Sequence, residues 1–253
     1  MKPDIVVDIG NTRIKWGWMP PDDTPMKVAS LPPDNETAWE RQLSQLPVSD
    51  SVSWAIASVH PERLKRFLTW ANTRSKRCQV IEHSHIPLKM DVDEPRQVGI
   101  DRLLNALAAR RRCPNGEPVV IIDAGSAVTV DFLDERGVFR GGAILPGPRL
   151  MARSLHEHTA KLPELPIHEI PAEDPPGRNT KDAITVGIMA ALMGGCVMLV
   201  DAYMAMSSRA PTILMTGGAI GELLDLDFAV GTQTGGPFPL TLEGIRIAAE
   251  ALP

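Results

Sequence analysis

Short apolar stretches occur at the start of the chain and again just before its middle. The first stretch, at 5–9, leads into the polar sequence DIGNT (8–12) and an alternating run at 12–18. The second begins at 118 and leads into DAGS (123–126) and an alternating run at 126–133. Alternation interrupted by Gly, Asn and Ser is typical of a β-hairpin. The pattern therefore predicts the same polar-tipped hairpin twice.

The rest of the pattern predicts that similar elements follow each hairpin. In the first half, helices are predicted at 35–46, 61–73 and 97–112, and strands at 52–59 and 78–82. In the second half, strands are predicted at 118–123, 126–133, 137–144, 211–216 and 227–230, and helices at 149–160, 180–206, from 218 and at 241–252. The turn-rich sequence CPNGEP (113–118) separates the halves. We therefore predict lobes at 1–115 and 116–253, each able to bury a core, with a cleft between them.

The residues at the predicted hairpin tips suit phosphate binding. Gly10 allows close backbone approach, and Asn11, Thr12 and Ser126 offer amide and hydroxyl groups. Asp8, at a strand end, is suited to holding a cation. An ordinary hairpin turn favours the same residue types. The repetition at the start of each half favours a nucleotide and metal site over a simple turn.

Composition narrows the class of protein. The chain of 253 residues is 43% hydrophobic and 23% charged, with a net charge of -5, so nucleic acid is not an expected partner. Three distant cysteines predict neither a disulfide framework nor a metal site, and His83, His85, His156 and His158 are expected to be ordinary surface residues. No signal peptide is apparent, and the apolar stretch 184–200 is short for a membrane span. A cytoplasmic protein without a membrane partner is expected.

A carboxylate and a guanidinium are predicted to emerge together at a helix start. Pro95 and Gly99 interrupt the chain, and apolar residues then recur at helical spacing, so the helix begins around Asp101 and Arg102. Asp in a first turn stabilises a helix, and the neighbouring Arg can pair with it. From these residues alone, structural and catalytic roles both stay open.

Six motifs in this order resemble the type III pantothenate kinases of the acetate and sugar kinase, Hsp70 and actin (ASKHA) superfamily. They are DIGNT (8–12), PRQVGIDR (95–102), DAGSAVTVD (123–131), GGAILPG (141–147), GRNT (177–180) and TGGA (216–219). The resemblance extends from residue 4 to about 244. It implies an α/β fold of two similar actin-like lobes, each a mixed sheet flanked by helices.

The resemblance also implies a reaction: transfer of a phosphoryl group from ATP to pantothenate, giving 4'-phosphopantothenate in the first step of coenzyme A biosynthesis. Such transfer depends mainly on positioning and charge neutralisation. The matching positions imply that Asp101 is the catalytic base and that further substrate contacts come from Gly99, Ile100, Arg102 and Thr180. They imply that ATP is bound by Gly10, Asn11, Thr12, Lys15 and Ser126. Asp8 would bind Mg²⁺ and ATP, and Asp123 would bind K⁺ or NH₄⁺.

Some positions depart from the family or have a second explanation. Val92 stands where the family commonly has tyrosine, and Ile100 replaces an alanine, so we expect altered pantothenate affinity. Thr180 also fits the N-cap of the long helix at 180–206. That helix is apolar on several faces, which fits burial in its own lobe or in the homodimer that the family forms. A kinase of another small alcohol and a non-catalytic accessory protein are the alternative functions.

Overall fold

The computed structural model describes residues 2–19, 25–47, 52–75, 77–114, 116–167, 174–219, 228 and 232–252. Contacts divide the chain into two compact units. Unit 1 comprises Met1–Leu88, Asp93–Arg111 and Pro239–Pro253, and unit 2 comprises Lys89–Val92 and Arg112–Phe238. Each unit contains its own five-stranded sheet.

The sheet of unit 1 has the order β3-β2-β1-β4-β5. Its strands are β1 (Ile5–Ile9), β2 (Ile14–Trp18), β3 (Lys27–Leu31), β4 (Trp54–Ser58) and β5 (Cys78–Val80). β1, β2 and β3 pair antiparallel, whereas β1, β4 and β5 run parallel. The helices are α1 (Glu36–Ser44), α2 (Pro61–Asn72), α3 (Ile100–Arg112) and α6 (Leu240–Glu250), and short 3-10 turns lie at His83–His85 and Pro95–Gln97.

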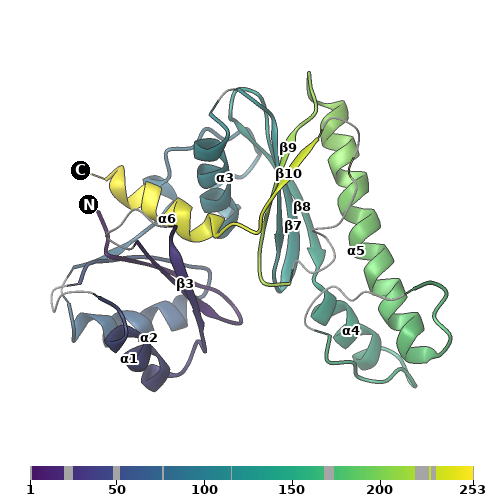
Figure 1. Ribbon diagram of the computed structural model, residues 1–253, viewed down its shortest axis with the longest axis horizontal. Helices are drawn as coiled ribbons and strands as arrows, with labels where there is room; N and C mark the ends of the chain where they lie inside the picture. The colour runs from purple at the N-terminus through teal and green to yellow at the C-terminus, as the bar shows by residue number, and fades with distance from the viewer. Residues whose placement is uncertain are drawn as a thin grey trace. The chain divides into compact units, whose positions relative to one another are not determined.

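Different helices pack on the two faces of this sheet. On one face, alternate residues of β1 and β2 pack against α1 and α2. The aromatic side chains in this core are Trp16, Trp39, Trp54, Phe67 and Trp70, and the centroids of contacting rings lie 5.2 to 6.1 Å apart. The opposite face is covered by α6, which contacts β1, β2 and β4 (Figure 1). These four tryptophans are buried, and Trp18 is half-buried.

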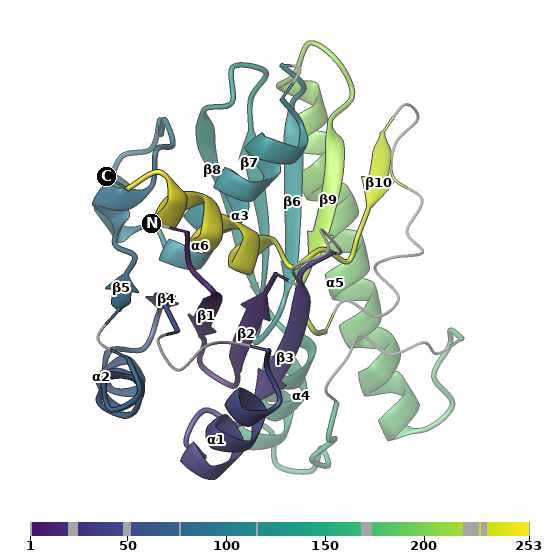
Figure 2. The ribbon, with the colours of Figure 1, turned by 60° about the vertical axis from the view of Figure 1, so that its left-hand side comes forward.

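Unit 2 repeats this topology. Its sheet has the order β10-β9-β6-β7-β8, with an antiparallel meander on one side of β6 and parallel strands on the other. The strands are β6 (Val119–Ala124), β7 (Ala127–Leu133), β8 (Phe139–Pro146), β9 (Thr212–Thr216) and β10 (Gln233–Gly235). Figure 2 shows them side by side, with α5 (Thr180–Ala205) behind the sheet. α4 (Pro148–Glu157) packs on β8 and α5, so the predicted duplicated α/β fold is confirmed.

Several elements differ from the sequence prediction. β3 and β10 were not predicted: β3 alternates poorly at its exposed sheet edge, and β10 has only three residues. α3 begins at Ile100, close to the start around Asp101 that Gly99 indicated and not at 97, because Pro95–Gln97 forms a separate 3-10 turn. The predicted helix from 218 and strand at 227–230 fall largely outside the described residues. Residues 239–253 group with unit 1, because α6 packs on the first sheet rather than on the second.

α5 is unusually apolar for a helix of its length. It has 26 residues with a mean hydropathy of 2.3 in its most apolar window, of which 28% is buried. By length and composition alone, this helix could cross a membrane. The core helix of a soluble protein meets the same criterion, so this is weak evidence for a membrane span.

Candidate active site

The tip of the first hairpin combines charged, amide and hydroxyl groups. Asp8 lies directly opposite Lys15 across the β1–β2 ladder, and both are half-buried. The Gly10 amide donates a hydrogen bond to the Arg13 carbonyl at 3.0 Å, which closes the turn. Asn11 and Thr12 are exposed between them. A carboxylate and polar tip groups therefore lie at one end of the strand pair.

The start of α3 explains why a glycine precedes the Asp-Arg pair. The Arg102 amide donates to Asp101 Oδ1 at 2.9 Å, so the carboxylate folds back over the helix start. A Cβ at Gly99 would lie only 2.5 Å from the same Oδ1. Glycine therefore leaves the space that this carboxylate occupies. Ile100 is 7% exposed, so most of its side-chain surface is already in contact with the protein.

α6 fixes the position of α3 within unit 1. Thr241 Oγ1 donates to Asn105 Oδ1 at 2.8 Å in a buried hydrogen bond. A Cβ at Gly244 would lie 2.1 Å from the Leu104 carbonyl oxygen, so the two helices approach closely at this glycine. Because α6 also packs on β1, one helix supports both the Asp101 helix and the Asp8 strand.

A histidine holds the segment that leads into α3. His83 Nε2 lies 2.7 Å from the Val98 carbonyl oxygen, immediately before Gly99. A carbonyl only accepts, so Nε2 is assigned as the protonated nitrogen. His83 is half-buried and supports the candidate site, a role that its sequence context did not indicate.

The second hairpin brings polar side chains together across three strands. Asp123 of β6 is paired in register with Thr129 of β7 and Thr216 of β9. Residues directly opposite in neighbouring strands point to the same face of a sheet. The Thr129 hydroxyl is buried and has no hydrogen-bond partner among the described residues. Neither threonine was predicted as a site residue, although both belong to the recognised motifs.

These groups fit a cation that takes part of its coordination from a ligand. Among the described residues, no three His, Cys, Asp or Glu side chains form a metal-binding group. A cation at Asp8 or Asp123 would therefore use water, hydroxyl or phosphate oxygens as further ligands, as Mg²⁺ commonly does. A buried hydroxyl without a partner costs about 1–3 kcal/mol, so the Thr129 hydroxyl suits a site completed by an ion or water.

The remaining predicted residues lie at exposed positions of unit 2. Ser126 is exposed at the hairpin tip, and its carbonyl accepts a hydrogen bond from the Gly147 amide at 3.2 Å. Thr180 is the first residue of α5 and is exposed. The prediction that Thr180 caps this helix is wrong, because the Asn179 side chain accepts from the Asp182 amide at 3.0 Å. Capping therefore does not explain Thr180.

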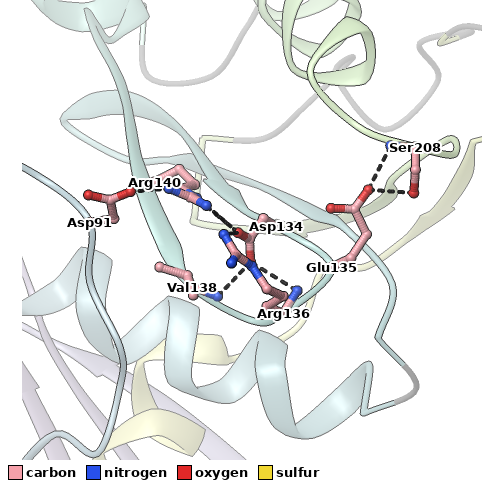
Figure 3. Close-up of polar contacts among 7 residues, drawn as sticks. All are labelled: Asp91, Asp134, Glu135, Arg136, Val138, Arg140 and Ser208. Carbon is pink, nitrogen blue, oxygen red and sulfur yellow. Dashed lines mark hydrogen bonds and ion pairs between the residues drawn. The ribbon is translucent and has the colours of Figure 1, made fainter.

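A second charged cluster, on the β7–β8 turn, has a structural role (Figure 3). Asp134 accepts hydrogen bonds from the amides of Arg136 and Val138, both at 2.9 Å, and from the Arg140 guanidinium, which also pairs with Asp91. Burial raises the pKa of Asp134, but these hydrogen bonds and the Arg140 charge together lower it below its ordinary value. Hydrogen bonds from the amide and hydroxyl of Ser208 likewise lower the pKa of Glu135.

The predicted site residues are divided between the units. Unit 1 contains the Asp8–Lys15 hairpin, whose strands contact α6, and the Gly99–Arg102 segment at the start of α3, which is hydrogen-bonded to α6. Unit 2 contains Asp123, Ser126 and Thr180. Their catalytic and binding roles stay predictions.

The repeated sheet order, with a polar hairpin at the centre of each unit, defines the ASKHA fold. A solved structure with a similar fold is ethanolamine utilization protein EutJ from Carboxydothermus hydrogenoformans. It matches with a TM-score of 0.54 and 11% identity, over 96% of this chain and 89% of that chain. The family described as Type III pantothenate kinase matches residues 5–202. The chain belongs to the type III pantothenate kinase family.

Individual relatives agree with this family. The chain is 40% identical to the type III pantothenate kinase of Rhodopirellula baltica over 59% of this chain and 54% of that protein. It is 34% identical to the Listeria monocytogenes enzyme over 63% of this chain and 59% of that protein. The chain thus spans little more than half the length of these two relatives. A match to the Halorhodospira halophila enzyme, at 31% identity, covers 87% of this chain and 88% of that protein.

Proposed function

We propose that this protein phosphorylates pantothenate with ATP, the first step of coenzyme A biosynthesis. The observation that carries the proposal is the Asp101 carboxylate, folded over Gly99 at the start of α3. It belongs to the same unit as the polar hairpin that carries Asp8. Family membership supports pantothenate over another small alcohol and supports an active enzyme over a non-catalytic accessory protein.

In the proposed reaction, the oxygen of the pantothenate primary hydroxyl attacks the γ-phosphorus of ATP, the bond to the β,γ-bridging oxygen breaks, and ADP leaves. Asp101 accepts the proton of the attacking hydroxyl. Arg102 and the Gly99–Ile100 backbone bind pantothenate, with Thr180 as a further contact. Gly10, Asn11, Thr12, Lys15 and Ser126 bind the phosphates, while Asp8 would hold Mg²⁺ and Asp123 would hold K⁺ or NH₄⁺. When bound, these cations would neutralise phosphate charge, on which phosphoryl transfer strongly depends.

The first test is formation of phosphopantothenate from labelled ATP, Mg²⁺ and pantothenate, with and without K⁺ or NH₄⁺. The wild type is expected to give product that depends on the monovalent ion. If no product forms under any ion condition, the pantothenate assignment fails. Turnover of another alcohol would then favour a different kinase, and nucleotide binding without turnover would favour an accessory protein.

Thr129→Val tests whether the buried hydroxyl beside Asp123 belongs to the cation site. We expect the K⁺ concentration for half-maximal activity to rise about tenfold, because a lost ligand contact of about 1.4 kcal/mol corresponds to that factor. Stabilisation against heat by K⁺ alone should weaken in parallel. The control is Thr212→Val at the start of β9, the end of that strand away from Thr216. The Thr212 hydroxyl donates a hydrogen bond to Glu117 at 3.2 Å. An unchanged K⁺ response in Thr129→Val would contradict this assignment.

We also propose that two copies associate through α5. No charged residue occurs between Ala183 and Val200. The outward-facing residues Ala183, Gly187, Ala190, Ala191, Gly194 and Met198 are exposed, and an added Cβ at Gly187 or Gly194 would contact nothing within 4 Å. Small residues allow two helices to approach closely, and burial would remove this apolar face from water. A second copy offers the same uncharged face, as a two-fold interface requires.

Light scattering after size-exclusion chromatography tests this assembly with Gly194→Arg. Two-fold symmetry would bring two added charges into the interface, so we expect a mass close to that of one chain, against two chains for the wild type. Val28→Arg, on exposed β3 of unit 1, is the control and should keep the wild-type mass. A dimeric Gly194→Arg protein would argue against α5 as the interface.

The cytoplasmic location and the absence of nucleic acid and membrane partners stay predictions. The net charge of -5 supports the expectation about nucleic acid, because such a surface does not attract a polyanion. The proposed dimer would bury the exposed apolar face of α5 without a membrane.

A further inference from the structure

The tip of the first hairpin is held by an arginine from α2. Arg63 Nη1 donates to the Gly10 carbonyl at 3.2 Å and also to the Asn11 carbonyl. Its Nη2 donates to Asp34 Oδ2 at 3.3 Å. The Arg63 side chain is 20% exposed, so the guanidinium lies mostly against the protein. One planar group thus binds two successive carbonyls of the tip.

These hydrogen bonds orient two consecutive peptide groups. In a trans peptide, the N–H points away from the preceding carbonyl. Because the Gly10 and Asn11 carbonyls face Arg63, the amides of Asn11 and Thr12 point to the opposite side of the tip. Successive N–H groups on one side of a turn form an anion-binding concavity. Arg63 therefore holds the tip in a conformation suited to phosphate.

Arg63 is itself on a rigid element. The His60 side chain caps α2 by accepting from the Arg63 amide at 3.4 Å, and Pro61 begins the helix. Farther along α2, Phe67 and Trp70 are buried in the aromatic core. The guanidinium is thus attached to a helix whose position is set by the core of unit 1, rather than by a loop.

We propose that Arg63 is a positioning residue for the nucleotide phosphates, acting through the backbone of the hairpin tip. This inference rests on the proposed use of ATP. Arg63 faces the carbonyl side of the tip and contributes by holding the amides of Asn11 and Thr12 in place. Without it, the tip samples other peptide orientations and the amides lose their alignment toward a bound phosphate.

Arg66 provides a matched comparison one turn along α2. It pairs with Glu36 at 3.0 Å and with Asp34 at 3.7 Å, and it also lies over the Trp39 ring. It shares with Arg63 the charge, the helix and one acidic partner. Among the described residues, Arg66 makes no hydrogen bond or ion pair with the hairpin tip.

The experiment compares Arg63→Met, Arg63→Lys and Arg66→Met by calorimetric titration with MgADP, without pantothenate. Arg63→Met is expected to bind about 5- to 50-fold more weakly, since it lacks charged hydrogen bonds that hold the tip. Arg63→Lys should not restore wild-type binding, because an ammonium does not reproduce the planar fork. Arg66→Met should stay within about twofold of the wild type. In turnover, the KM for ATP should rise while the KM for pantothenate changes less than twofold.

Hydrogen exchange at the tip gives a readout that does not depend on activity. Amide exchange at Asn11 and Thr12 should accelerate in Arg63→Met while the α2 core amides keep their protection. The inference would be overturned if Arg63→Met bound MgADP within twofold of the wild type. It would also be overturned if Arg63→Lys bound MgADP as tightly as the wild type. If the wild type binds MgADP but does not phosphorylate pantothenate, the proposed reaction fails while the role of Arg63 is still decided by binding. No MgADP binding by the wild type would overturn both.

Discussion

Replacing Asp101 by asparagine is expected to lower kcat for pantothenate phosphorylation by about 100- to 10,000-fold, the usual contribution of a positioned general base. An amide does not accept the hydroxyl proton, whereas its oxygen can still accept the hydrogen bond that the Arg102 amide donates at 2.9 Å. The local geometry is therefore expected to survive. Pantothenate and MgADP binding, measured by titration, should change much less than kcat.

The control for Asp101→Asn is Glu62→Gln, the same change of an acid to an amide in the first turn of another helix. Both substitutions remove a favourable interaction with a helix N-terminus, worth about 0.3–1 kcal/mol, so similar small losses of thermal stability are expected. Only Asp101→Asn should lose turnover. A kcat within tenfold of the wild type in Asp101→Asn would assign the proton acceptor to another group.

Gly217→Ala is expected to destabilise unit 2 by at least about 2 kcal/mol, because strain and overpacking act together. Gly217 has a φ of +105°, a backbone conformation that residues with a Cβ rarely adopt. A Cβ there would lie 2.2 Å from the Ala124 carbonyl oxygen. That carbonyl accepts from the Ala219 amide at 2.8 Å, so the backbone has little freedom to move away. Because Ala124 follows Asp123, loss of K⁺ activation is expected to accompany the loss of stability.

The neighbouring Gly218 offers a closely matched control within the same motif. An added Cβ at Gly218 would meet nothing within 4 Å, and the residue is exposed. Gly218→Ala should therefore change the stability by less than about 0.5 kcal/mol. Thermal unfolding of both variants, followed by circular dichroism, makes the comparison. Equal melting temperatures for the two variants would contradict the close packing of Gly217 on Ala124.

Features that depend on neighbouring residues were predicted well. Both hairpins follow from alternating apolar residues and from glycine at the turn, and the structure has them at β1–β2 and β6–β7. The helix after Gly99 was also expected, because Pro95 and Gly99 interrupt the chain just before a helical apolar pattern. Local backbone preferences and side-chain periodicity are sufficient for these elements.

Features that depend on distant pairing were not predicted. Thr216 lies next to Asp123 only because β9 joins β6 in one register, and a shift by one residue would turn its side chain to the other face. Arg63 meets the Gly10 carbonyl only because α2 packs with its first turn beside the hairpin. Neither contact leaves a periodic signal in the sequence, since each joins segments more than 50 residues apart.

By itself, the sequence determined the duplicated hairpins, the ASKHA class and the family, because local turn chemistry and six ordered motifs carry that information. Only the tertiary structure decided that α6 joins unit 1, that Asn179 rather than Thr180 caps α5, and that Gly99 makes room for the Asp101 carboxylate. It also decided that Arg63 holds the first hairpin tip and that a buried Thr129 hydroxyl lies opposite Asp123 in the second sheet. The physical reason is that close packing and strand register select among many contacts that local sequence allows equally.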